Sequence, residues 1–84
     1  MKFWVKAYNN EKLILNILKI DTQPITAVWL EALLRQLCDE HDLPTPIVTE
    51  INAKNLITFN HTQFKQCDFL ESINFDYLEV SRYK

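Results

Sequence analysis

Apolar and polar residues alternate strictly at the start of the chain, which predicts a half-buried β-strand over Lys2 to Tyr8. One side of this strand carries only apolar residues: Phe3, Val5 and Ala7. The other side mixes aromatic rings with lysines: Lys2, Trp4, Lys6 and Tyr8. Asn9-Asn10 suits a tight turn, and the run from Lys12 to Ile20 predicts a second strand. Together they form an N-terminal β-hairpin.

The second strand of this hairpin is apolar on both sides. Ile14 and Leu18 have the parity opposite to that of Leu13, Leu15 and Ile17. One of these two sets must therefore point away from any helix that packs on the sheet.

Spacings of three and four residues then predict an amphipathic helix from about Ile25 to His41. The segment Asp21-Thr22-Gln23-Pro24 is typical of a helix start, and Leu43-Pro44 ends the helix because proline disfavours α geometry before it. We expect Trp29, Leu33 and Leu37 at the centre of the core.

The second half of the chain has weaker patterns. Pro46 to Ile51 is rich in β-branched residues, and Leu56 to Phe59 is a short apolar patch, so each predicts a short strand. His61 to Asn74 is mixed, with room for one helical turn. Alternation returns from Phe75 to Arg82 and predicts a closing strand.

This order of elements predicts an α+β fold in a single domain over residues 1–84, with one helix packed on a mixed sheet. A hairpin crossed by one helix, with the last strand returning beside the first, favours the ubiquitin-like β-grasp topology. A ferredoxin-like split fits less well because only one convincing helix is present.

Composition narrows the function classes. The 84 residues carry 9 Lys and Arg against 11 Asp and Glu, a formal charge of −2, so we do not expect a basic nucleic-acid arm or a polybasic membrane anchor. No apolar run approaches the length of a membrane span, and no signal-peptide core follows the N-terminus. The expected location is the cytoplasm.

The sequence contains no glycine and three prolines. Glycine-rich phosphate loops, dinucleotide fingerprints and nucleophile elbows are therefore excluded, since each needs a backbone approach that only glycine allows. Turns with positive φ must use Asn or Asp.

Three segments together resemble a short uncharacterised protein family of clostridia and related Firmicutes. They are the acidic and aromatic ending from Cys67 to Val80, the segment from Asp42 to Ile47, and Thr62-Gln63-Phe64. The resemblance covers nearly the whole chain and is a packing and strand pattern. It implies a similar fold and no known activity.

Two cysteines and two histidines supply the ligand types that zinc prefers: Cys38, His41, His61 and Cys67. Their spacing matches no finger or knuckle, and no CxxC is present, so we expect no metal, cofactor or catalytic residue. Cys67 with His61 is the only pair suited to nucleophilic catalysis, and nothing in the sequence predicts a lowered thiol pKa there.

The aromatic residues of the strands give the strongest functional signal: Trp4, Tyr8, Tyr77 and Tyr83. We expect them to form a partner surface, with a homodimer as its simplest form. The protein is then a non-enzymatic interaction module or adaptor. Two alternatives stay open, namely a small acidic inhibitor derived from a phage or mobile element and a weak single-stranded RNA binder that stacks bases on these rings.

Overall fold

The predicted hairpin forms the start of the fold. In this computed structural model, which describes residues 1–83, β1 (Lys2–Asn9) pairs antiparallel with β2 (Lys12–Ile20). The turn consists of Asn10 and Glu11, with φ values of 51° and 65°, so the prediction of a turn at Asn9-Asn10 is wrong by one residue. Asn10 fulfils the expectation for a chain without glycine, whereas Glu11 shows that a residue other than Asn or Asp also adopts this region.

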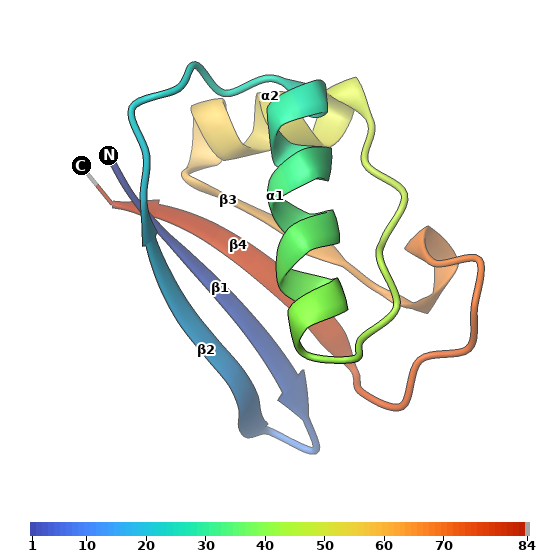
Figure 1. The fold of residues 1–84 in the computed structure, drawn as a ribbon. Helices are drawn as coiled ribbons and strands as arrows, with labels where there is room; N and C mark the ends of the chain where they lie inside the picture. The colour runs from blue at the N-terminus through green and yellow to red at the C-terminus, as the bar shows by residue number, and fades with distance from the viewer. Residues whose placement is uncertain (84) are drawn as a thin grey trace.

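Within residues 1–83 the sheet has four strands in the order β2-β1-β4-β3, where β3 spans His61–Phe64 and β4 spans Tyr77–Tyr83. β4 lies beside β1, as predicted for the closing strand (Figure 1). Every pairing is antiparallel, so the prediction of a mixed sheet is wrong. The predicted α+β class is confirmed, whereas the more specific β-grasp topology is not.

The first helix, α1 (Ala27–Glu40), lies within the predicted range. It begins later than the Asp21–Pro24 signal suggests, because Thr26 is the N-cap and its Oγ1 accepts a hydrogen bond from the Trp29 backbone N–H at 3.1 Å. The Asp21 side chain instead accepts hydrogen bonds from the Gln23 backbone N–H and from the Trp29 indole in the first turn of α1.

A second helix, α2 (Glu50–Phe59), replaces the two short strands predicted between residues 46 and 59, which are therefore wrong. The Asn52 side-chain oxygen accepts from the Thr49 backbone N–H at 2.9 Å and from its hydroxyl at 3.1 Å. This arrangement is a capping box in which Asn takes the place of Glu or Gln. Asn60 ends the helix with φ of 64°.

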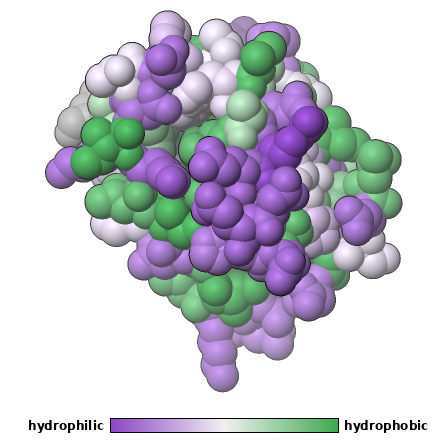
Figure 2. Space-filling model, in the orientation of Figure 1, coloured by the Kyte–Doolittle hydropathy of each residue, from purple (hydrophilic) through white to green (hydrophobic). Residues whose placement is uncertain are grey.

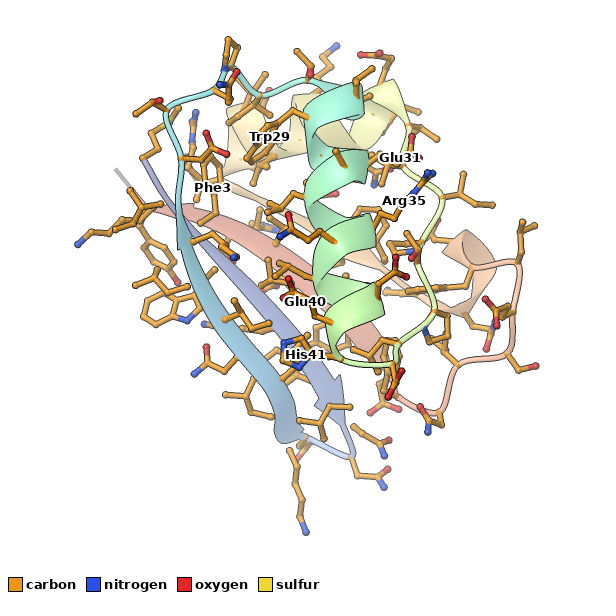
Figure 3. The ribbon with its side chains drawn as sticks, viewed as in Figure 1. Phe3, Trp29, Glu31, Arg35, Glu40 and His41 are labelled. Atoms are coloured by element: carbon orange, nitrogen blue, oxygen red, sulfur yellow. The ribbon has the colours of Figure 1, made fainter. Side chains whose placement is uncertain are left out.

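The core lies between one face of the sheet and the two helices, which cover that same face. Helix α1 contributes Leu30, Leu34 and Leu37, which are 0–1% exposed. Trp29 and Leu33, expected at the centre, lie at the margin of the core instead. Trp29 packs on Phe3 with ring centroids 4.7 Å apart (Figure 3).

The segment between β3 and β4 also packs on the helix side. It contains one short 3-10 turn, η1 (Gln66–Asp68), as expected, and then Phe69 and Phe75, which join the core with ring centroids 5.7 Å apart. The outer surface on this side is largely polar where α1 faces the solvent (Figure 2). Within residues 1–83, no helix packs on the opposite face of the sheet.

Candidate functional site

The candidate site is the face of the sheet that points away from the helices, which we call the back face. Because Phe3, Val5 and Ala7 are buried under the helices, the alternate residues of β1 lie on the back face. Directly opposed residues of antiparallel strands share a face, so the registers extend this set. The back face comprises Lys2, Trp4, Lys6, Tyr8, Leu13, Asn16, Leu18, Ile20, His61, Gln63, Tyr77, Glu79, Ser81 and Tyr83.

Four aromatic rings on the back face form two cross-strand pairs between β1 and β4. Trp4 and Tyr83 pack edge to face with centroids 5.2 Å apart. Tyr8 and Tyr77 stack with centroids 5.0 Å apart. The rings that the sequence places in a candidate partner surface therefore lie on one face, and each has a neighbour that limits its rotation.

Charged groups lie between these aromatic pairs. The Lys6 ammonium is 4.9 Å from the centroid of the Trp4 ring, within cation–π range. Glu79 lies opposite Lys6 in the register, and its two oxygens accept hydrogen bonds from Gln63 at 3.0 Å and from Ser81 at 3.3 Å. Partial desolvation, and then the Glu79 carboxylate, raise the pKa of the Tyr77 hydroxyl above its ordinary value of 10.0, so Tyr77 is uncharged at neutral pH.

Strand β2 adds aliphatic side chains to the back face. Leu13, Leu18 and Ile20 are 45%, 48% and 72% exposed. The prediction that Leu13 shares a face with Leu15 is wrong, because a bulge at Ala7/Tyr8 pairs Leu13 with Tyr8 and Leu15 with Ala7. This extra residue reverses the parity of the strand at its start.

The structure also decides whether the second half of the chain buries the back face. The apolar segments of that half that could fold over this face are Leu56-Ile57 and Phe69-Leu70. Leu56 and Phe69 belong to the core under the helices, whereas Ile57 and Leu70 are 49% and 90% exposed. No element of residues 1–83 therefore covers the aromatic rings of the back face.

The four cysteine and histidine residues do not form one cluster. Cys38 is buried in α1, and His41 caps the same helix, while Cys67 is exposed in η1 and His61 lies on β3. Among the described residues, no group of three or more His, Cys, Asp or Glu side chains could hold a metal ion. Burial, and then the Asp39 charge, raise the pKa of the Cys38 thiol to about 11, the reverse of what a nucleophile needs.

An open groove of about 350 Å³ lies between α2 and β3, lined by Asn55, Phe59, His61, Thr62, Gln63 and Lys65. Its lining is mostly amide, hydroxyl and apolar groups. His61 and Lys65 are its only titratable groups, and no carboxylate or thiol lines it.

Comparison of the chain with protein-family models, with curated proteins and with solved structures finds no match. The resemblance to the family of clostridia and related Firmicutes therefore stays a prediction. In residues 1–83, no helix is both long enough and apolar enough to cross a membrane.

Proposed function

We propose that this protein is a non-enzymatic interaction module that binds a partner protein through its back face. The observation that carries the proposal is the pair of packed aromatic couples, Trp4 with Tyr83 and Tyr8 with Tyr77, on a sheet face that no described element covers. Aromatic residues held in place by neighbours lose little entropy on binding, and they dominate binding hot spots.

The size of the back face suits a protein contact. Four strands about 4.8 Å apart and about seven residues long cover on the order of 450 Å² of flat sheet. A standard interface buries about 800 Å² per partner. Side chains that protrude from the sheet, including the aliphatic residues of β2, make the accessible area larger than the flat area. The back face therefore supplies much of the area of a standard interface.

The charges of the back face indicate the chemistry of the partner. Lys2 and Lys6 lie on this face although the chain as a whole has a charge of −2. The carboxylate on the face, that of Glu79, already accepts two hydrogen bonds within the chain. We therefore infer a folded partner whose contact patch is apolar at its centre and carries carboxylates at its rim. The acidic-inhibitor alternative would need a contact surface of the opposite sign.

The arrangement of the rings favours a protein over single-stranded RNA. A base needs an open ring face on which to stack. The ring of Trp4 has the Lys6 ammonium over it, and Tyr8 and Tyr77 stack on each other. The cytoplasm remains the expected location of this interaction.

Site-specific photo-crosslinking tests the proposal. A photoreactive phenylalanine replaces Tyr8 on the back face or, as the control, Val28, which is 78% exposed on α1. The protein captured through position 8 is identified, purified and titrated by calorimetry against wild type, Trp4→Ser and Val28→Ser. We expect Trp4→Ser to weaken binding about tenfold or more and Val28→Ser to change it less than about twofold.

Two results would overturn the proposal. One is equal affinity of the wild type and Trp4→Ser for the captured protein, which would place the contact elsewhere. The other is Trp4-dependent binding of a fluorescent oligouridylate in the same buffer, which would make the back face a nucleic-acid surface.

A further inference from the structure

We propose that β2 pairs with β2 of a second copy of this chain, so that two sheets join edge to edge into one sheet. This inference rests on the proposed function, since it says how the back face is presented to the partner. The starting observation is that β2 is an outer strand of nine residues, and β1 is the only strand hydrogen-bonded to it within residues 1–83. An outer strand leaves every second N–H and C=O without a strand partner.

The two edges of the sheet differ in their capacity to pair. β3, at the other edge, has only four residues and lies against α2. β2 is more than twice as long and consists largely of β-branched and aliphatic residues. A long apolar edge strand is the feature that natural sheets usually avoid or pair. The unpaired backbone N–H and C=O groups of β2 are therefore better suited to pairing with another strand than to contact with a globular surface.

The charged side chains of β2 do not oppose its pairing with β2 of a second copy. A two-fold axis perpendicular to the sheet keeps each side chain on its own face, so within regular strand two opposed residues are separated by an even number of positions. The bulge interrupts this alternation between Leu13 and Leu15, so the regular part of the edge is Leu15 to Ile20. Lys19 is the only charged residue of that part, and with Ile17 on the axis it lies opposite Leu15 of the partner.

The interface area sets the expected strength. A strand of nine residues is about 30 Å long, and a sheet is about 10 Å thick, so the pairing buries on the order of 300 Å² of planar section per chain. Interfaces this small belong to the weak class below about 1,200 Å² in total. We therefore expect reversible dimers at high concentration, with a dissociation constant on the order of 100 μM.

The consequence for function is geometric. The perpendicular two-fold axis places both back faces on the same side of the joined sheet. Leu18 and Ile20 of both copies then lie along the seam, between the two sets of aromatic pairs. The dimer presents one continuous apolar and aromatic surface with two equivalent sites, and a two-fold symmetric partner would bind it with increased avidity.

Amide hydrogen exchange and sedimentation of the purified protein test this inference. At 20 μM, alternate amides of β2 should exchange fast because they face solvent. At 1 mM the mass should rise towards that of a dimer, and these amides should exchange at least about tenfold more slowly as the outer edge pairs. Leu18→Lys and Ile20→Lys should weaken dimerisation about tenfold or more, while the control Val28→Lys should not. Circular dichroism establishes that each variant is folded, and Ile20, the more exposed residue, provides the second variant if Leu18→Lys unfolds.

The outcomes separate this inference from the proposed function. A monomer at 1 mM with fast alternate amides overturns the β2 pairing and leaves the crosslinking result at position 8 untouched. A dimer that keeps the fast amides of β2 and is dissolved by Trp4→Lys is joined back face to back face, which also overturns it.

Discussion

The indole Nε1–H of Trp29 donates a hydrogen bond to the carboxylate of Asp21 across 2.9 Å. The same carboxylate accepts the backbone N–H of Gln23 at 2.8 Å through its other oxygen. Because Trp29 packs on Phe3, these bonds fasten the turn after β2 to the start of α1 and to β1. A residue that resembles a helix cap in the sequence thus acts as a clamp between three elements.

This clamp predicts a dependence of stability on pH. The hydrogen bond from Trp29, and then that from Gln23, hold the pKa of Asp21 below its ordinary value of 3.8. A lowered pKa in the folded state stabilises the fold above the unfolded pKa, and this contribution is lost as the pH falls through the folded pKa. We therefore expect the free energy of unfolding to fall below about pH 4, and Asp21→Asn to make that fall shallower.

Trp29→Phe is a second variant that tests this prediction. It keeps the ring contact with Phe3 but removes the indole N–H. Urea unfolding between about pH 2 and pH 6 should give a shallower fall for Trp29→Phe than for the wild type. Equal slopes for wild type and Asp21→Asn would show that this carboxylate is not a source of the acid dependence.

The orientation of α1 gives a second prediction. Leu34 is fully buried, whereas Leu33 is partly buried at the margin of the core. Leu34→Ala should lower the free energy of unfolding by about 2–5 kcal/mol, and Leu33→Ala by less than half as much. Urea titration of both variants decides the point. Equal losses would mean that α1 is rotated towards the orientation that the sequence pattern suggests.

Local patterns account for the hairpin, for α1 and for the closing strand, because each has a clear period of two or of three and four residues. They fail between residues 46 and 59, where β-branched residues predict strands and the chain forms α2. The deciding contacts there are the capping bonds of Thr49 with Asn52 and the core position of Leu56. Tertiary packing overrides weak strand propensity in this segment.

Asn52 provides a third prediction, since it connects the start of α2 to the sheet. Its Oδ1 accepts from the Thr49 backbone N–H at 2.9 Å, and its Nδ2 donates to the Thr62 hydroxyl at 3.1 Å. Asn52→Ala should therefore cost about 1–2 kcal/mol of stability. Asn55→Ala on the same helix is the control and should stay within about 0.5 kcal/mol, as measured by thermal or urea unfolding.

The candidate site, like the fold, could be predicted in part from the sequence. The alternation in β1 places Trp4 and Tyr8 on one face, but nothing local says that Tyr83 and Tyr77 lie opposite Lys2 and Tyr8. That register depends on contacts between residues 69 to 81 positions apart. The position of Leu13 was missed because a bulge has no clear signature in this sequence.

A fourth prediction concerns the stability of the back face. Trp4 and Tyr8 pack on other back-face rings and lie outside the core. The double variant Trp4→Lys with Tyr8→Glu should therefore stay folded and lose about 1–3 kcal/mol, whereas Phe3→Ala should lose about 3–5 kcal/mol. Light scattering and urea unfolding measure both effects. An unfolded double variant from a monomeric wild type would mean that the face is internal core.

The last prediction concerns the two thiols. Cys38 is 1% exposed, and burial raises the pKa of its thiol to about 11, so about 0.1% of it is thiolate at pH 8. Cys67 is exposed. A chromogenic disulfide reagent should therefore titrate one thiol quickly in the folded protein and the second only in denaturant. Cys67→Ser should abolish the fast phase, and Cys38→Ser should preserve it.

Because a raised thiol pKa favours the folded state only below the unfolded pKa, the free energy of unfolding should also decline as the pH rises from about 9 towards 11. This decline should be smaller in Cys38→Ser. Fast modification of both thiols in native protein would show that the C-terminal turn of α1 opens readily and that Cys38 is not held in the core.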